Sequence, residues 1–249
     1  MKYPNFITEE EFRELHEGLS EIDILKQFSQ NLKLIINLGK QPLADTLLSK
    51  KFDPKKIKKY PLKLVRCCKC SCSQLSYVVS GSKVYHKKYP YRAGITKTLK
   101  DYQKKLSAKL CTKYRLNKKS FVIDIGSNDG TLLEGFKTKT KILGIEPTNT
   151  AKIARTNGIN TIQDFTNEKL AKKIVNKYGK ADLITATNVF AHMADLGKVL
   201  RSIEILLNDN GHFVLENHYL LDIIKDLQFD SIYHEHVRTY SLKPIIKLF

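Results

Sequence analysis

The run Tyr233-His234-Glu235-His236 is the densest group of chemically reactive side chains in the sequence. Imidazole titrates near neutral pH, so a histidine here is suited to act as a general base. A tyrosine hydroxyl can donate a hydrogen bond to an oxygen on which negative charge develops. His-x-His offers a metal only two ligands, and no third lies nearby in the sequence. Surface histidines ahead of a helix are the third interpretation.

A glycine-rich loop, Asp124-Ile125-Gly126-Ser127-Asn128-Asp129-Gly130, follows an apolar run and precedes a helical stretch. Glycines there let the backbone pass close to a ligand. Glu146 ends the next apolar run, in the position from which an acid binds a ribose diol. A dinucleotide is disfavoured, because Asn128 replaces the second glycine of G-x-G-x-x-G and Asp129 would repel a pyrophosphate. S-adenosylmethionine, which is cationic and carries no phosphate, fits better.

Two later positions extend the expected cofactor site. Asp164 can meet the adenine amino group while Phe165 covers the ring, although Asp164 could equally cap the helical stretch that starts at Asn167. The segment 188–192 follows the fourth apolar run, on the rim where open α/β sheets bind ligands. The residues expected to bind the cofactor are Asp124, Gly126, Ser127, Asn128, Asp129, Gly130, Glu146, Pro147, Asp164, Phe165 and Asn188.

These residues need a parallel sheet to bring them together. Apolar runs typical of strands lie at 121–125, 141–145, 159–163, 181–187 and 212–216, and helical stretches at 131–136, 149–157, 167–178 and 196–207. Strict alternation of strand and helix is typical of a parallel α/β sheet. We therefore expect a Rossmann-like domain over residues 119–249.

Residues 1–118 follow a different pattern, which predicts a smaller α+β domain. A capping box at Thr8 starts an amphipathic helix. Alternating apolar residues predict strands at 32–38, 60–65 and 74–79, and a Cys-rich turn separates the last two. An aromatic and basic loop at 85–92 and a helix at 96–114 lead to the second domain.

The composition excludes several classes of protein. The 249 residues are 42% hydrophobic and 27% charged, unlike collagen, coiled coils or disordered chains. No apolar run approaches the ~18 residues of a membrane span. The N-terminus does not read as a signal peptide, so we expect a cytoplasmic protein whose five cysteines are thiols or metal ligands.

The positive charge is concentrated in one segment. Residues 50–119 hold 22 Lys and Arg against two acids, whereas the rest of the chain holds 21 bases and 23 acids. Such a segment can bind phosphates, either of a nucleotide-linked substrate or of nucleic acid. An equally good interpretation is that these lysines are only solvated on exposed faces and have no binding role.

The sequence resembles the sugar C-methyltransferase family, whose members methylate carbon 3 of nucleotide-linked 4-keto-6-deoxy sugars. The strings that carry the resemblance are L-G-K-Q-P-L-A-D, C-C-K-C-S-C-S-Q-L, Y-P-Y-R-A-G, D-I-G-S-N-D-G-T-L-L, G-I-E-P, N-V-F-A-H and Y-H-E-H. The resemblance implies S-adenosylmethionine as cofactor and a nucleotide-linked sugar as substrate. It also implies that His236 is the base and that Tyr233, Glu235 and His192 line the reacting centre. It further assigns Tyr89, Tyr91 and Arg92 to the substrate.

The sequence departs from that family at three places. The family has a zinc knuckle with two Cys-x-x-Cys pairs, and only the second, Cys67 and Cys70, is present. Since tetrahedral zinc needs four ligands, we expect no full-occupancy zinc. Ala93 stands where the family has a serine. The family also continues beyond Phe249, so we expect a truncated chain, with a second chain supplying the rest, or an inactive remnant.

Overall fold

The computed structural model describes residues 31–45, 53–86 and 89–249. The helix expected from Thr8 lies outside these residues. The chain forms two compact units, Ser80–Glu216 and a second one that joins the residues up to Val79 with Asn217–Phe249. The expected boundary between residues 118 and 119 stays a prediction, because compact packing is not by itself a test of separate domains.

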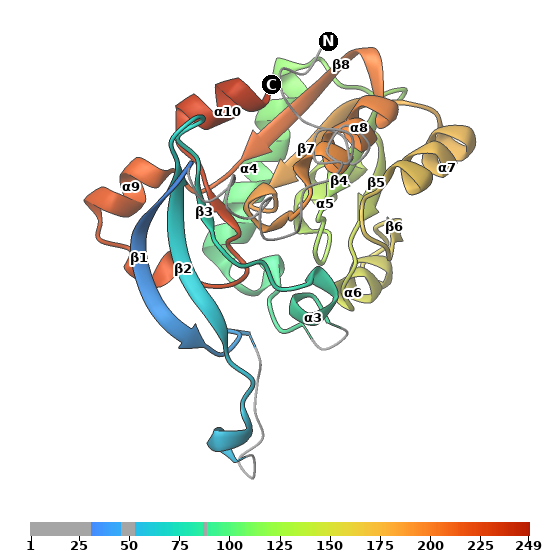
Figure 1. The fold of residues 1–249 in the computed structure, drawn as a ribbon. Coiled ribbons are helices and arrows are strands. Elements are labelled where there is room, and N and C mark those ends of the chain that lie inside the picture. Colours follow the sequence, from blue (N-terminus) through green and yellow to red (C-terminus); the bar gives the residue numbers. More distant parts are fainter. Residues whose placement is uncertain (1–30, 46–52, 87–88) are drawn as a thin grey trace. The chain divides into compact units, whose positions relative to one another are not determined.

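The unit Ser80–Glu216 is built on a parallel sheet with the strand order β6-β5-β4-β7-β8 (Figure 1). Its strands are β4 (Phe121–Ile125), β5 (Lys141–Ile145), β6 (Thr161–Ile162), β7 (Ala181–Thr187) and β8 (Leu207–Glu216). All four neighbouring pairs are parallel, which confirms the expected α/β sheet. The strand order reverses between β4 and β7, and open sheets of this kind bind ligands at the carboxyl ends of such strands.

Helices fill the connections between these strands, and one more helix precedes β4. The connecting helices are α5 (Thr131–Lys137), α6 (Thr150–Thr156), α7 (Glu168–Tyr178) and α8 (Leu196–Leu206), and the preceding one is α4 (Lys97–Lys113). One hydrophobic core joins α4, α5 and α6 to the central strands through residues such as Leu110, Leu133, Ala154 and Val122. Two strands differ from expectation: β8 starts five residues before His212, and β6 is reduced to two residues. Their ends depend on pairing with neighbouring strands, which local patterns do not show.

The other unit holds an antiparallel sheet with the order β1-β2-β3-β9. Its elements are β1 (Leu32–Gln41), β2 (Tyr60–Cys67), β3 (Ser73–Leu75), β9 (Arg238–Thr239), α9 (Leu220–Lys225) and α10 (Leu242–Leu248). Leu62, Leu64 and Leu75 form its core. The strand expected at 74–79 ends at Leu75 because the sheet continues through β9 instead. β1 continues past Gly39, whose φ of +72° places it at an irregular step in the ladder.

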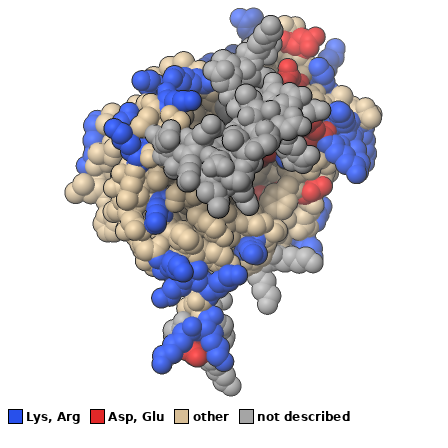
Figure 2. All heavy atoms as spheres, in the orientation of Figure 1, with Lys and Arg blue, Asp and Glu red and all other residues tan. Residues whose placement is uncertain are grey.

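Short elements complete the two units: η1 (Pro54–Lys56), α3 (Gly81–Val84), η2 (Ala93–Ile95), η3 (Phe190–His192) and η4 (Phe229–Ser231). Exposed lysines surround η1 at 55, 56, 58 and 59, where Figure 2 shows a group of basic side chains. Other exposed lysines lie on α4, at positions 97, 100, 104, 105, 109 and 113. Binding of nucleic acid by this segment stays a prediction. Among the described residues, no helix is both long and apolar enough to cross a membrane.

The close packing of α4 against α5 yields a test of the fold. A Cβ at Gly135 would lie 1.9 Å from Ser107 Oγ and 2.8 Å from Ser107 Cβ. Gly135→Ala should therefore lower the free energy of unfolding by ~1–3 kcal/mol, because overpacking outweighs the gain in helix propensity. Urea denaturation monitored by circular dichroism measures this.

Gly197 in α8 supplies the matched control. A Cβ there would have its nearest neighbour at 3.5 Å, which is ordinary contact. Gly197→Ala should leave the stability unchanged or raise it by up to ~1 kcal/mol. Equal effects of the two substitutions would contradict the packing described for Gly135.

Candidate active site

The glycine-rich loop after β4 is held tightly at the point where the strand order reverses. The N–H of Gly126 donates to the Ile145 carbonyl at 2.8 Å, and the N–H of Gly130 donates to the Ser127 carbonyl at 2.9 Å. Gly126 has a φ of +70°, and a Cβ on it would lie 2.3 Å from Val189 Cγ1. Glycine is thus required at 126 both by its backbone conformation and by the close approach of the loop that follows β7.

Glu146 at the end of β5 fixes the same loop from the other side. Its side chain is buried, and Oε2 accepts the N–H of Asn128 at 3.0 Å while Oε1 accepts the N–H of Thr148 at 2.8 Å. A carboxylate oxygen has two lone pairs. Glu146 can therefore accept further hydrogen bonds from a ribose diol. Pro147, which follows it, is half-buried.

Asp124 in β4 and Ser127 in the loop that follows face the interior of the protein. Asp124 is 2% exposed and accepts a hydrogen bond from the Thr185 hydroxyl at 2.7 Å. Burial raises its pKa to about 7, the hydrogen bond from Thr185 opposes the shift, and the charge of Glu146 adds to it. Ser127 is buried too, and its Oγ would lie 2.4 Å from a Cβ at Gly144.

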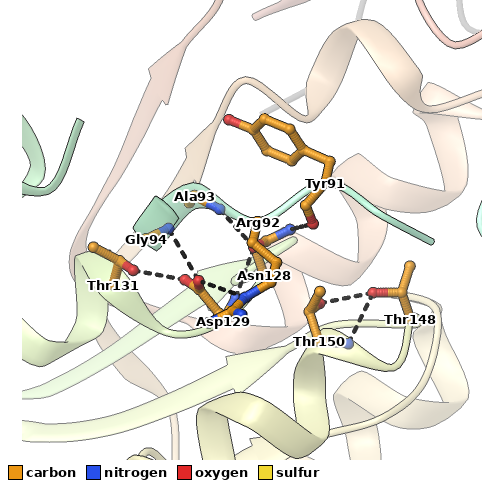
Figure 3. Close-up of polar contacts among 9 residues, drawn as sticks. All are labelled: Tyr91, Arg92, Ala93, Gly94, Asn128, Asp129, Thr131, Thr148 and Thr150. Carbon is orange, nitrogen blue, oxygen red and sulfur yellow. Dashed lines mark hydrogen bonds and ion pairs between the residues drawn. The ribbon is translucent and has the colours of Figure 1, made fainter. Parts of the chain in front are cut away.

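Asn128 binds the segment Tyr91–Gly94 to the loop (Figure 3). Its side-chain Oδ1 accepts the N–H of Ala93 at 2.9 Å and that of Asp129 at 2.9 Å. Its Nδ2 donates to the Tyr91 carbonyl at 3.3 Å. The expected substrate segment and the expected cofactor loop therefore share one hydrogen-bonding side chain.

Asp129 continues this attachment. Its carboxylate, 3% exposed, accepts the Thr131 hydroxyl at 2.6 Å and the N–H of Gly94 at 3.0 Å. Arg92 Nε lies 3.6 Å from Oδ2. Gly94 must be glycine here, because a Cβ would lie 2.6 Å from Thr131 Oγ1 and 2.8 Å from Asp129 Oδ2. The sequence analysis expects the negative charge of Asp129 to attract a cationic cofactor. In the structure, Arg92 of the chain itself lies beside that charge.

The strand ends that follow β6 and β7 carry the remaining expected cofactor residues. Asp164 Oδ1 accepts the N–H of Phe165 at 2.8 Å, whereas the cap of α7 is Asn167, which accepts the N–H of Leu170 at 2.9 Å. The interpretation of Asp164 as a helix cap is therefore wrong. Asp164 and Phe165 are both exposed, as contact with a ligand requires.

His192 lies in η3, directly after β7, beside an aromatic residue that the sequence analysis did not single out. The ring of Tyr85 meets the His192 ring edge-on, with centroids 5.8 Å apart, and contacts the Tyr89 ring at 5.4 Å. Tyr85 lies within the aromatic and basic run that contains Tyr89 and Tyr91, and this clustering was the available signal. The rings of Tyr89, Tyr85 and His192 thus form a continuous series of contacts from the expected substrate segment to the loop after β7.

Two polar residues at this edge of the sheet, Tyr102 and Glu216, were missed as well, and they lie beside the expected cofactor residue Asn188. Tyr102 on α4 donates its hydroxyl to Glu216 at the end of β8, and this hydrogen bond raises the pKa of Tyr102 to about 12. Asn188 Nδ2 donates to Glu216 Oε1 at 3.3 Å, and its N–H donates to the Glu216 carbonyl at 2.8 Å. The φ of +55° at Asn188 is thus held by contacts with Glu216. No local pattern connects residues so far apart in sequence.

In the unit that contains residues 217–249, a turn separates the two histidines of the Tyr233–His236 cluster. His236 Nδ1 lies 2.8 Å from the Ser231 carbonyl, and Nε2 lies 3.1 Å from the Tyr233 hydroxyl. A carbonyl only accepts, so Nδ1 carries the proton in the neutral ring, and Nε2 is left as the basic nitrogen. The geometry thus gives His236 the tautomer of a general base that works through Nε2.

His234 has a different environment. It is 2% exposed, its Nε2 lies 3.3 Å from the Tyr60 carbonyl, and its ring meets the Tyr60 ring edge-on. Glu235 is buried as well. His234 therefore packs in the core of its unit, and the turn at residues 234–235 gives the two histidines different surroundings.

Residues 91–249 match a family model described as "Methyltransferase domain", which covers more than half of the chain. The chain belongs to this methyltransferase family. Residues 28–85 match a second family model, described as "Putative zinc binding domain".

One characterised relative and several solved structures are similar to this methyltransferase. It is 30% identical over 217 residues to the C-methyltransferase NovU of Streptomyces niveus, a match over 86% of this chain and 51% of that protein. The chain thus spans about half the length of the curated relative that it matches. A SAM-dependent methyltransferase from Archaeoglobus fulgidus shows 16% identity and a TM-score of 0.48, over 59% of this chain and 66% of that one. The YcgJ protein of Bacillus subtilis shows 18% identity and a TM-score of 0.45, over the same shares.

S-adenosylmethionine stays the expected cofactor of this methyltransferase, and the residues present fit it. The loop after β4 lies where the strand order reverses. Glu146 keeps lone pairs for a ribose, and exposed Phe165 follows β6. The assignment of single residues to the cofactor stays a prediction.

The cysteine turn does not fit a tetrahedral zinc site. Among the described residues, no three His, Cys, Asp or Glu side chains are grouped so that they could hold a metal ion. Cys68 is exposed, and Cys72 is buried, which raises the pKa of its thiol to about 12. Within residues 31–45, 53–86 and 89–249, Cys67 and Cys70 thus have no two further ligands grouped with them to complete a zinc site.

Metal analysis of protein purified without chelators tests this conclusion. We expect well below one zinc per chain, because two thiols alone bind zinc weakly. One zinc per chain that is lost in Cys67→Ser would contradict the expectation and would require ligands from elsewhere.

The buried carboxyl of Asp124 predicts a pH dependence of stability. Its pKa in the folded protein, about 7, lies above the ordinary value of 3.8. The ionised form is therefore disfavoured in the fold, so this residue lowers the stability increasingly as pH rises from about 4 to 7. The full effect above pH 7 is on the order of 4 kcal/mol.

Asp124→Asn removes this titration and keeps an acceptor for the Thr185 hydroxyl. Without cofactor, the variant should gain stability relative to the parent protein as pH rises from 5 to 8, measured by urea unfolding at each pH. A difference between the two proteins that is the same at every pH would contradict the raised pKa.

Proposed function

We propose that the protein methylates a carbon atom beside a ketone in a nucleotide-linked deoxy sugar, with His236 as the base. The observation that carries this proposal is the hydrogen bonding of His236, which directs Nδ1–H to a carbonyl and leaves Nε2 basic beside the Tyr233 hydroxyl. The likeness to a C-methyltransferase over most of this chain supports carbon as the methylated atom.

The chemistry needs two groups that act on neighbouring atoms. A ketone acidifies the C–H bond next to it, and a base near neutral pH can take that proton. In our proposal His236 Nε2 accepts the proton, while the Tyr233 hydroxyl turns from Nε2 to the ketone oxygen and stabilises the enolate. The Ser231 carbonyl then holds the second N–H of the imidazolium.

S-adenosylmethionine supplies an electrophilic methyl group on a sulfonium, and the enolate carbon is the nucleophile that such a group alkylates. Glu146 and the loop 126–130 would hold the nucleoside part, with Asp164 and Phe165 at the adenine. Tyr89, Tyr91 and Arg92 would bind the sugar nucleotide, and His192 would lie at the reacting centre. The chain spans about half of its relative, so the activity and the substrate of the whole protein are part of this proposal.

Hydrogen exchange at carbon 3 isolates the proton step. A nucleotide-linked 4-keto-6-deoxy sugar is incubated in D₂O with the protein and S-adenosylhomocysteine, and deuterium incorporation is followed by NMR. His236→Ala should slow the exchange by ~10²–10⁴-fold, the usual contribution of a general base.

His234→Gln is the comparison variant, because a glutamine amide can still donate to the Tyr60 carbonyl. It should keep the exchange near that of the parent protein. Exchange that persists in His236→Ala but is lost in His234→Gln would reverse the assignment. Absence of exchange in the parent protein would count against the sugar substrate itself.

A further inference from the structure

Three hydrogen bonds attach Tyr91–Gly94 to the loop after β4, near the expected site (Figure 3). Three consecutive peptide groups of this segment take part, through the carbonyl of Tyr91 and the N–H groups of Ala93 and Gly94. All three bond to Asn128 or Asp129. Backbone groups, unlike flexible side chains, fix the path of the chain when they are held.

The polar atoms of Asn128 and Asp129 already have partners within the protein. Asn128 uses both Oδ1 and Nδ2 for the attachment, whereas Asp129 accepts the Gly94 N–H with Oδ2 and the Thr131 hydroxyl with Oδ1. Asp129 is 3% exposed, and Arg92 lies 3.6 Å from it. A buried carboxylate with an arginine beside it offers little net charge to a sulfonium or an ammonium group.

The attachment continues to Glu146. The Oε2 atom of Glu146 accepts the backbone N–H of Asn128, whose side chain in turn holds Ala93 and Tyr91. A nucleoside bound at Glu146 would restrict that carboxylate and, through it, the backbone of Asn128. A continuous chain of hydrogen bonds thus connects the expected ribose site with the segment 91–94.

We propose that Asn128 and Asp129 are positioning residues that couple the two sites: occupation of the cofactor site orders Tyr91–Gly94, and that segment then binds the methyl acceptor. The acceptor part rests on the proposed function, since Tyr91 and Arg92 are the residues assigned to the sugar nucleotide. The coupling itself does not depend on which acceptor is used. Coupling between sites is reciprocal, so the acceptor should also strengthen binding of the cofactor.

Two substitutions weaken the attachment with little other change. Asn128 has a φ of +50°, which glycine adopts readily, so Asn128→Gly deletes the side chain and keeps the backbone path. Asp129→Asn is isosteric, removes the charge beside Arg92 and leaves one acceptor oxygen, for which the Gly94 N–H and the Thr131 hydroxyl must compete. Glu134→Gln on α5 is the matched control, because Glu134 lines the same small cavity as Arg92 and Asp129 but makes no part of the attachment.

Amide hydrogen exchange of residues 91–95 and calorimetry with S-adenosylhomocysteine give the first test. In the parent protein and in Glu134→Gln, the ligand should slow exchange of the Ala93 and Gly94 amides. In Asn128→Gly and Asp129→Asn these amides should exchange at least ~10-fold faster and lose their response to the ligand, since a lost hydrogen bond permits local opening. The variants should keep the circular dichroism spectrum of the parent protein, which shows that they fold.

The outcomes separate the alternatives. A Kd that rises ~10-fold in Asp129→Asn while the amides stay protected would make Asp129 a direct cofactor ligand and overturn the proposal. Amides that are equally protected in all four proteins would overturn it too.

Steady-state kinetics with a nucleotide-linked 4-keto-6-deoxy sugar form the second test. The variants should raise the KM for the sugar with little change in kcat at saturation. If the parent protein does not turn the sugar over, the proposed function fails, whereas the amide exchange still decides the coupling.

Discussion

The hydrogen bond from the Asn128 backbone to the buried Glu146 carboxylate determines much of this site. It joins the loop after β4 to the end of β5, and so fixes the turn from which the side chains of Asn128 and Asp129 reach residues 91–94. An unpaired buried carboxylate would be costly, which keeps this contact in place. The missing Cβ of Gly126 has a complementary effect, since it lets Val189 bring the loop after β7 against the same turn.

The sheet is predictable from the sequence, because buried parallel strands appear as continuous apolar runs separated by helical periodicity. The runs at 121–125, 141–145 and 181–187 match β4, β5 and β7 residue for residue. Strands whose ends depend on pairing, such as β3 and β8, are less predictable. Two strand residues of β3 pair with β9, more than 160 positions away in sequence.

The sequence predicts where the residues of the candidate site lie better than it predicts what each side chain does there. The sequence places Asp129 at a loop where a cofactor binds, but its partners, Gly94 and Arg92, lie about 35 residues earlier. His234 and His236 are equivalent in spacing, and only the turn between them gives one a core position and the other a basic Nε2. Tyr102 and Glu216 are 114 residues apart, and no motif relates them.

Helix α4 begins three residues after Gly94, at Lys97, with Thr96 as its cap. Its buried residues, Gln103, Ser107, Leu110 and Cys111, form one stripe, and its Tyr102 reaches Glu216. Since each residue turns a helix by about 100°, the phase of α4 is set by the number of residues between Gly94 and the cap. One residue inserted there would rotate Ser107 away from Gly135 and Tyr102 away from Glu216 together. The length of this connection is therefore as constrained as the identity of any side chain in the site.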